Sequence, residues 1–532
     1  MKLFSTQQRQ AWVVGAGWFV LLLVLAALRP LAVPDEGRYA EIGRWMLVSA
    51  DWLTPRLDGI PFFHKPPLLH WLEAGAMSAL GVSAWVARLV PAVHAALMLG
   101  GLYLATRHMA GDKLALRAVW MMGSSLAFLL GGQYVNHDMM VATWISLAIW
   151  CLALALAHQP DLQATWARWG FVACALGVMS KMLIGLALPG LVLLLWLAWT
   201  RQLNRILKLP WISGLLLFGA IAVPWFVLEQ MRYPDLMAYM FGTQQLGRYT
   251  GSSFNNAQPW WFYLPVLLVL LFPWAFFALA LAWRQWRGRY VLNTISTKWL
   301  ALAWIGEGAI VLFFSIPHSK IVGYVLPVVP ALALLSAVGW EQVMGQRRHE
   351  QRWFAALVLL NVGLAVAANV AAARLTAQHS SQDIAVSLAC QARADDTVYA
   401  LGEYPYDLPF YAGLNQPVVV VQDWPTLRQS AGDNWRRELF EGADFDSTAA
   451  RVLQTPAVLP QAAAVAGHWL VTPNRPPPGT PDPLASGWLP VQHGQAWSLY
   501  RSAPKGPETA QDKGLSGCDQ HRSNQSPKGW PF

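Results

Sequence analysis

Repeated apolar runs constrain this chain more than any other feature, because roughly 20 apolar residues are what an α-helix needs to cross a bilayer. The composition agrees, since 55% of the 532 residues are hydrophobic and only 13% are charged. The runs stand at about Ala11–Leu28, Leu89–Leu104, Ala115–Gly131, Met139–Ala157, Trp169–Met182, Leu183–Trp199, Trp211–Leu228, Trp260–Trp283, Trp299–Ser315, Ile321–Trp340 and Trp353–Ala373. We therefore predict a polytopic α-helical membrane protein with about 11–13 transmembrane helices, and we exclude a soluble globular protein.

Two apolar segments need separate treatment. Ala11–Leu28 is too long for a signal-peptide core and ends without a small-residue cleavage site, so we expect it to stay as a membrane anchor. Pro66–Leu80 is short and is split by His70 and Glu73. This second segment predicts an interfacial helix, with a short membrane hairpin as the alternative.

Basic residues gather in alternate loops, and the positive-inside rule places those loops in the cytoplasm. They are Lys2, Arg9, Arg107, Lys113, Arg117, Arg168, Arg201, Arg205, Lys208, Arg284, Arg287, Arg289, Arg347, Arg348 and Arg352. The net charge of +9 follows from these residues, so no nucleic-acid partner is expected. The opposite loops carry mixed charge, and we expect the chemistry of the protein to face outward.

Beyond Ala373 the pattern becomes that of a water-soluble domain. Asp383–Arg393 resembles a helix, and Thr397–Leu401 and Pro417–Val421 resemble strands. We predict a small α/β domain outside the membrane. After about Arg501 the chain is rich in Pro, Lys, Gly, Ser and Gln, which is typical of disorder.

The first candidate site is the segment Pro34-Asp35-Glu36-Gly37-Arg38-Tyr39-Ala40-Glu41, directly after the first apolar run. Charge so close to a bilayer is costly and often functional. The alternative is an ordinary solvated loop. Two adjacent acids next to Pro34, followed by Arg38 and Tyr39, favour a functional site.

Two further segments are less specific when taken alone. In Phe62-Phe63-His64-Lys65-Pro66-Pro67, the prolines stiffen the backbone that presents Lys65, which could equally be a lysine snorkelling beside an interfacial helix. Asn136-His137-Asp138 begins an apolar run and Lys181 ends another. Helix capping explains the first of these, so the residues alone assign no role.

The fourth segment is His318-Ser319-Lys320, with Tyr324 four positions after the lysine. Residues at i and i+4 share a helix face, so we predict that Lys320 and Tyr324 point into one cavity. A snorkelling lysine and an interfacial tyrosine are the alternative.

Cations are what these outward segments share. Arg38, Lys65, Arg248 and Lys320 come to one membrane face, interleaved with the acids Asp35 and Asp138. Such a site suits a lipid phosphate, because cations neutralise a phosphate leaving group.

The order and spacing of these segments resemble bacterial GT-C glycosyltransferases, within the dolichyl-phosphate-mannose protein mannosyltransferase-like superfamily, and in particular the lipid A aminoarabinose transferases. The motifs that carry the resemblance are Pro34 to Glu41, Phe62 to Pro66, Asp138, Ser180-Lys181, Ser319-Lys320 and Tyr324-Val325-Leu326-Pro327. The resemblance implies a GT-C transmembrane catalytic domain at 1–375 with periplasmic loops 30–84 and 230–259, a periplasmic α/β domain at 376–502 and a disordered tail at 503–532.

The resemblance also implies roles for individual residues. Asp35 would be the principal catalytic carboxylate and Asp138 a second catalytic residue, and Asp138 and Tyr324 would line the same cavity. The substrate-binding residues would be Glu36, Arg38, Tyr39, Lys65, Arg248, Lys320 and Tyr324, of which Arg38, Lys65 and Arg248 would hold the phosphate of the donor.

A divalent metal is possible by resemblance, but its usual site is altered here. In those enzymes the residue before the motif lysine is commonly Glu, which can bind a metal together with a His in a later loop. Here His64 replaces the Glu, and no His lies between Phe241 and Pro259. Met182 also stands after Lys181, where the family usually has Gly.

The expected activity is transfer of a sugar from undecaprenyl phosphate to a lipid A phosphate, on the periplasmic face of a bacterial inner membrane. The sugar would be aminoarabinose or a hexosamine. One alternative is a transferase that modifies a protein or polysaccharide hydroxyl. Another is a lipid-linked sugar transporter, which would predict paired repeats and polar features on both membrane faces.

Overall fold

The computed structural model describes residues 6–157, 163–247, 256–290, 295–432 and 434–502. The chain divides into two compact units. The helical unit consists of residues up to Leu28, His64–Leu69 and Arg88–Val370, and the sheet unit consists of Arg29–Phe63, His70–Ala87 and the chain from Ala371 onward. Most of the loop 30–84, which the sequence groups with the membrane domain, therefore packs with the C-terminal part of the chain.

The helical unit is built almost entirely from helices. Its long apolar helices are α1 (Thr6–Ala26), α4 (Ala84–Ala110), α7 (His137–Ala157), α10 (Trp211–Arg232), α14 (Thr297–Ser315), the continuous pair η3 (Val322–Val328) and α15 (Val329–Met344), and α16 (Glu350–Ala377). Shorter helices are α5 (Asp112–Gly123), α6 (Leu126–Gly131), α8 (Ala164–Lys181), α9 (Ile184–Trp199), η1 (Leu203–Lys208), η2 (Ala238–Gly247), α12 (Tyr263–Leu270) and α13 (Ala275–Trp286). The chain is thus a multi-pass membrane protein, as predicted.

By length and composition alone, fewer single helices qualify as membrane spans than there are apolar runs in the sequence. Within the described ranges, seven helices are long and apolar enough to cross, or eight if α12 and α13 count as one broken span, against the expected eleven to thirteen. Every apolar run does form helix, but two of the runs are interrupted. Ser125 accepts a hydrogen bond from the Phe128 amide at 3.2 Å and caps α6, which splits one run. Pro273, which has no amide hydrogen, stands at the 117° bend between α12 and α13.

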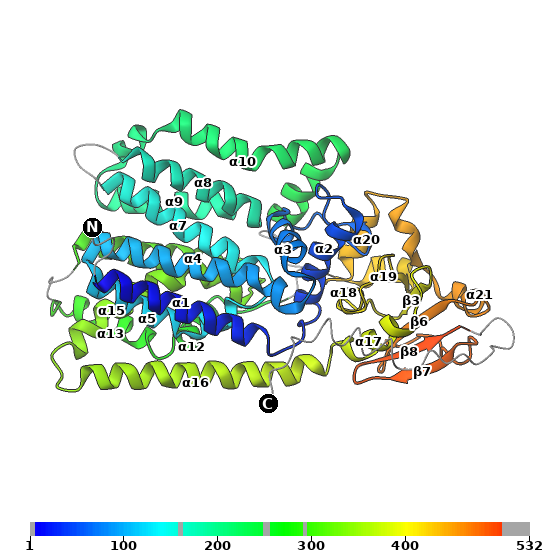
Figure 1. Ribbon diagram of the computed structural model, residues 1–532. Coiled ribbons are helices and arrows are strands. Elements are labelled where there is room, and N and C mark those ends of the chain that lie inside the picture. Colours follow the sequence, from blue (N-terminus) through cyan, green and yellow to red (C-terminus); the bar gives the residue numbers. More distant parts are fainter. Residues whose placement is uncertain (1–5, 158–162, 248–255, 291–294, 433, 503–532) are drawn as a thin grey trace. The chain divides into compact units, whose positions relative to one another are not determined.

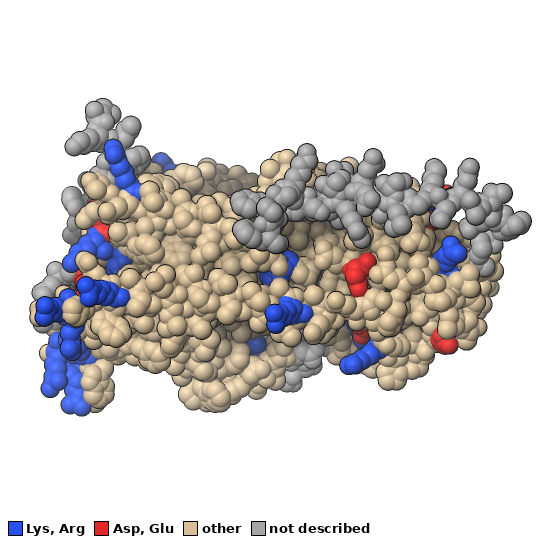
Figure 2. Space-filling view, turned by 60° about the horizontal axis from the view of Figure 1, so that its bottom comes forward, with Lys and Arg blue, Asp and Glu red and all other residues tan. Residues whose placement is uncertain are grey.

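Packing in the helical unit centres on α7, which is buried along nearly its whole length. It lies beside α8 and α9 and contacts η3, while α8 also packs on α10, and α15 packs on α13 and α5 (Figure 1). Figure 2 shows basic side chains at one end of this unit, next to a broad band without charged side chains. Such a band is what the hydrocarbon core of a bilayer requires.

The sheet unit begins with the first candidate segment. Its early elements are α2 (Asp35–Ser49), the hairpin strands β1 (Arg56–Leu57) and β2 (Ile60–Pro61), and α3 (Leu68–Leu80), which crosses from one unit to the other. α3 has 13 residues, too few to span a bilayer, in agreement with the predicted interfacial helix.

The rest of the sheet unit is an α/β layer. Its strands are β3 (Thr397–Leu401), β4 (Val419–Val421), β5 (Leu453–Gln454), β6 (His468–Pro473), β7 (Leu489–His493) and β8 (Trp497–Arg501), in the order β5-β4-β3-β6-β8-β7. Its helices are α17 (Gln382–Gln391), α18 (Leu408–Ala412), α19 (Trp424–Ser430), α20 (Arg437–Ala443), η4 (Ala449–Val452), η5 (Pro456–Val458) and α21 (Leu459–Ala463).

The sheet is parallel at its centre and antiparallel at one side. β3 pairs in parallel with β4 and β6, with Ala400 opposite Val420 and Val471, whereas β8 is antiparallel to β6 and β7. β3 is buried on both faces, which explains why its sequence is apolar without alternation. The predicted strand Thr397–Leu401 is therefore confirmed. The predicted tail 503–532 lies outside the described residues.

α2 packs against the α/β layer. It packs on α18, and a Cβ added at Gly37 would lie 3.1 Å from the backbone of Tyr406 and Asp407. On the following loop, the rings of Phe63 and Phe445 meet at 5.1 Å. The sequence could not show these contacts, because they join positions more than 350 residues apart.

Candidate functional site

Asp35 is the first residue of α2 and forms an ion pair with Arg38. The distance from Arg38 Nη2 to Asp35 Oδ1 is 2.6 Å, and 43% of the Asp35 side chain is exposed. An acid in the first turn also interacts favourably with the helix dipole. The i, i+3 spacing on a helix places these two predicted residues side by side, with one carboxylate facing outward.

Arg38 is the centre of this cluster. Its second guanidinium nitrogen binds Glu438, and Nη2 also donates to the Tyr39 hydroxyl at 3.1 Å. Burial alone would lower the pKa of Arg38, but Glu438, Tyr39 and Asp35 together raise it well above its usual range. Arg38 is therefore a permanent cation held between acids from two distant parts of the chain.

Glu36 differs from the partly exposed Asp35 in its burial. It is fully buried, it binds the guanidinium of Arg29, and it accepts the backbone amide of Ala32 at 2.8 Å. These contacts hold the turn before α2. Its expected contact with substrate stays a prediction.

A buried pair, His70 and Glu73, lies next to Tyr39. The rings of Tyr39 and His70 are 6.0 Å apart, and His70 Nδ1 lies 3.4 Å from the Glu73 carboxylate. Burial raises the pKa of Glu73 well above its usual range, and Glu36 raises it further. Burial lowers the pKa of His70 to about 3. His70 is therefore neutral at pH 7, and burial favours the neutral form of Glu73.

The helical unit holds a separate cluster at the ends of its central helices. Asp138 in the first turn of α7 binds the ammonium group of Lys181, the last residue of α8. The Lys181 ammonium also lies 4.3 Å from the centre of the Tyr324 ring, a cation–π contact. Lys181 therefore contacts both Asp138 and Tyr324.

Two neighbours explain this geometry. Asn136 Oδ1 accepts the amide of Asp138 at 2.9 Å and so provides the helix capping. Asn136 Nδ2 also donates to Asp138 Oδ2 at 3.1 Å, while Lys181 binds the other carboxylate oxygen. A Cβ added at Gly323 would lie 2.1 Å from Asp138 Oδ2. Only a glycine at this position lets η3 approach the carboxylate so closely.

The predicted pairing of Lys320 with Tyr324 is wrong. Lys320 precedes η3, a 3₁₀ helix containing Pro327, so the two residues do not share an α-helical face. Its ammonium donates to the carbonyls of Gln258 at 3.0 Å and Pro317 at 2.5 Å. In the structure Lys320 fastens the 256–258 segment to the loop before η3.

Lys65 and its neighbour His64 belong to the helical unit. Lys65 Nζ donates to the carbonyl of His64 at 3.0 Å, and His64 Nε2 lies 2.8 Å from the Tyr239 hydroxyl, to which Gln244 also donates at 3.0 Å. One imidazole with a phenol and an amide is a poor set of metal ligands. In the described parts of the chain, no group of three His, Cys, Asp or Glu residues could hold a metal. We therefore derive no step through a metal.

Three site residues differ in how well the sequence pattern and the structure define them. Arg248 lies outside the described residues. Lys181 received no role from its own surroundings, although the Ser180-Lys181 motif was a signal for it. Glu438 carried no signal at all, because its partner Arg38 stands 400 positions earlier.

The helices and the sheet together define a polytopic membrane protein with a C-terminal α/β layer. In fold, the chain is similar to ArnT from Cupriavidus metallidurans bound to undecaprenyl phosphate, with a TM-score of 0.74, 24% identity, and coverage of 93% of this chain and 99% of that one. The same protein in its apo state also gives a TM-score of 0.74, with 23% identity, 94% of this chain and 100% of that one.

Sequence comparison finds relatives among the glycosyltransferases. Residues 21–240 match the dolichyl-phosphate-mannose-protein mannosyltransferase family. The chain is 31% identical to undecaprenyl phosphate-alpha-4-amino-4-deoxy-L-arabinose arabinosyl transferase 2 of Pseudomonas fluorescens, over 62% of this chain and 56% of the relative. A Pseudomonas aeruginosa enzyme of the corresponding name is 30% identical over 69% of this chain and 66% of the relative. The chain is thus similar to aminoarabinose transferases and spans less than two thirds of the length of these curated relatives.

Proposed function

We propose that this protein transfers an amino sugar from undecaprenyl phosphate to a phosphate of lipid A. The observation that carries the proposal is a pair of acid–cation clusters, Asp35 with Arg38 and Asp138 with Lys181, on a GT-C fold. The names of the relatives support the donor class. The acceptor is an extension from the resemblance.

In the sheet unit, we assign the reacting carboxylate to Asp35. Arg38 binds one of its oxygens and fixes its direction, while the side chain stays partly exposed to a ligand. A carboxylate so placed can orient the sugar and balance positive charge that builds at the anomeric carbon. Arg38, Tyr39 and the buried Glu36 would hold this element in place.

In the helical unit, we assign phosphate binding to cations. Lys65, Arg248 and Lys181 are the proposed groups, with Asp138 and Tyr324 positioning Lys181. Lys320 is bound to two carbonyls, so its proposed part is to position the loop before η3 rather than to contact the phosphate directly.

The reaction balances without a strong base. An oxygen of the lipid A phosphate attacks the anomeric carbon, the bond from that carbon to the donor phosphate breaks, and undecaprenyl phosphate leaves with the electron pair. A phosphate monoester with a second pKa near 6 is largely ionised at pH 7. The proposed cations stabilise the phosphate that leaves. We place this reaction on the periplasmic face of the inner membrane, because the basic loops assign the opposite face to the cytoplasm.

Mass spectrometry of lipid A from cells with and without the gene tests the proposal. We expect a pentosamine or hexosamine increment on a phosphate, and its mass distinguishes the two sugars. Unchanged lipid A in cells that demonstrably contain the protein would overturn the acceptor and favour a protein or polysaccharide hydroxyl. In that case Asp35 would have to accept a proton.

A further inference from the structure

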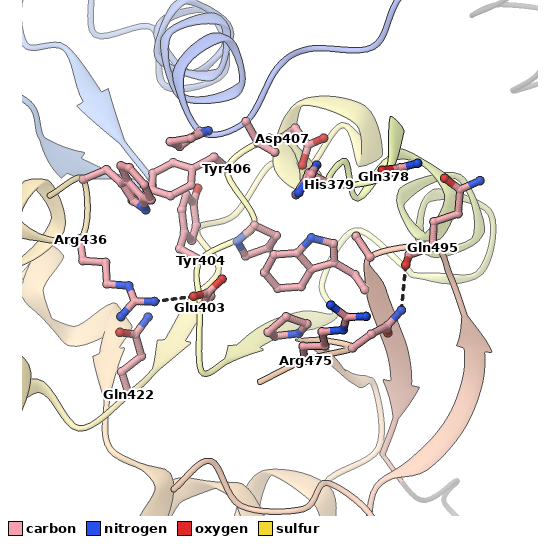
Figure 3. A pocket seen from close by; sticks show the side chains of 18 of the residues that line it. Gln378, His379, Glu403, Tyr404, Tyr406, Asp407, Gln422, Arg436, Arg475 and Gln495 are labelled. Carbon is pink, nitrogen blue, oxygen red and sulfur yellow. Dashed lines mark hydrogen bonds and ion pairs between the residues drawn. The ribbon is translucent and has the colours of Figure 1, made fainter. Parts of the chain in front are cut away.

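The sheet unit contains a cavity of about 530 Å³ that none of the clusters above uses. It opens among the loop after α16, the loop between β3 and α18, the start of α20 and the turn between β6 and β7 (Figure 3). Its walls include Pro34, Tyr406, Trp435, Arg436, Arg475 and Trp497. All of its lining residues belong to the sheet unit.

The lining combines aromatic faces with planar polar groups. Trp435 is 46% exposed and Trp497 is buried at 7%. Figure 3 shows Arg436 paired with Glu403. Asn474 also donates to the Gln495 carbonyl at 3.1 Å. Aromatic faces that contact C–H groups, next to fixed hydrogen-bonding groups, suit a saccharide.

Two polar groups in the cavity wall, the Arg475 guanidinium and the Tyr406 hydroxyl, could bind a polar ligand. Arg475 is exposed and, among the residues that the structure describes, forms no ion pair. Tyr406 is only 6% exposed, and its buried hydroxyl has no hydrogen-bond partner in the described chain. A buried polar atom without a partner is costly unless a ligand or water completes it. The Arg475 guanidinium, which lines the same cavity, favours an anionic group such as a phosphate.

The cavity is joined to the Asp35 segment. Pro34 lines it, and Asp35 is the next residue but is not part of the wall. Burial raises the pKa of Tyr406 well above its usual range, Glu438 raises it further, and Arg38 lowers it. Tyr406 is therefore electrostatically coupled to the cluster around Arg38. A ligand in the cavity would thus lie next to the reacting carboxylate without occupying its position.

We propose that this cavity binds the phosphorylated sugar headgroup of the acceptor and presents a phosphate toward Asp35. The proposal rests on the proposed function and assigns a site to the acceptor that is separate from the donor lipid. A volume of about 530 Å³ is within the range of small-molecule pockets and can hold a disaccharide. Arg475 binds the phosphate, and Trp435 covers a sugar ring.

The full-length protein in detergent, with Arg475→Ala and Trp435→Ala variants, tests this site. Each variant should raise the KM for lipid A about tenfold, leave the KM for the donor unchanged, and keep kcat at saturating acceptor. Arg451→Ala is the matched control, because Arg451 is exposed in η4 and does not line the cavity. An unchanged acceptor KM in both cavity variants would overturn the proposal.

Direct binding separates this proposal from the proposed function. Calorimetry with deacylated lipid A, a bisphosphorylated glucosamine disaccharide, should show binding to the wild type and about tenfold weaker binding to Arg475→Ala. The disaccharide without its phosphates should bind the wild type and Arg475→Ala equally. Absence of binding, or binding that neither variant weakens, refutes the cavity site even if lipid A is modified. Binding without any transfer would instead refute the proposed reaction alone.

Discussion

Asp138 and Lys181 form an ion pair between the beginning of α7 and the end of α8, 43 positions apart in the chain. Only 9% of the Asp138 side chain and 13% of the Lys181 side chain are exposed. Removing one partner of such a pair leaves the other charge buried and uncompensated, which costs about 3–5 kcal/mol. The pair therefore couples the stability of the helical unit to the position of a charged group near Tyr324.

Lys181→Met is the first test of this coupling. We expect the free energy of unfolding to fall by about 3 kcal/mol and transfer to be lost, because the Asp138 carboxylate loses its cationic partner. Thermal unfolding in detergent and a transfer assay measure the two effects. The double variant Asp138→Asn/Lys181→Met should regain stability but not activity. Recovery of both would show that the pair is only structural.

Gly323→Ala tests the same carboxylate without changing any charge. The added methyl group would lie 2.1 Å from Asp138 Oδ2, so the carboxylate or the η3 backbone must shift. A displacement of about 1 Å at a reacting site can cost about 100-fold in rate. We expect a loss of kcat on this scale.

Gly308→Ala is the matched control, since no atom lies within 4 Å of a Cβ at that helical position. Equal activity of the two alanine variants would mean that the Asp138–Lys181 geometry does not matter for transfer.

The part of the site that sequence predicts is the part set by local spacing. Asp35 and Arg38 stand at i and i+3 of one helix, so their ion pair follows from the motif itself. Strand β3 has the predicted bounds, because a buried parallel strand leaves a continuous apolar run.

The remaining features depend on contacts that no local pattern encodes. Lys320 directly follows Ser319, which forms an isolated β-bridge with Ala257. The backbone at Lys320 is therefore not helical, and helical spacing does not apply to it. Arg38 meets Glu438 through packing of the C-terminal layer on α2. The broken spans are hidden because mean hydropathy does not register one capping serine or one proline.

Asp35→Asn should abolish transfer and leave folding intact. The Asp35 side chain is 43% exposed, and exposed ion pairs contribute about 0–1 kcal/mol to stability. We expect a loss of kcat of about 100-fold or more with a normal unfolding temperature. Asp395→Asn, at an exposed position of the same unit, is the control. Full activity of Asp35→Asn would refute the assignment of the reacting carboxylate.

Glu438→Gln tests what holds Arg38. The guanidinium would keep Asp35 but lose the charge of Glu438, its strongest acidic partner. We expect Arg38 to bind the Asp35 carboxylate more tightly and to make it less available to the sugar. A kcat reduced about tenfold at unchanged donor KM would support this role. Unchanged kinetics would show that Glu438 has no part in positioning Arg38 for transfer.

Glu73→Gln should change how stability depends on pH. Burial raises the pKa of Glu73 well above its usual value of 4.5, so above that value the native state binds more protons than the unfolded state. The stability from the neutral carboxyl is complete below pH 4.5 and is lost as pH rises toward and through the folded pKa, by up to about 1.4 kcal/mol per pH unit.

Gln keeps the neutral shape and cannot ionise, so the unfolding temperature of Glu73→Gln should exceed that of the wild type by an amount that grows as the pH rises above about 4.5. The neighbouring His70, with a pKa of about 3, is present in both proteins, so its own effect on stability below about pH 6.5 is common to both. Asp395→Asn should track the wild type throughout. A difference between Glu73→Gln and the wild type that stays constant with pH would show that Glu73 is not held neutral in the folded protein.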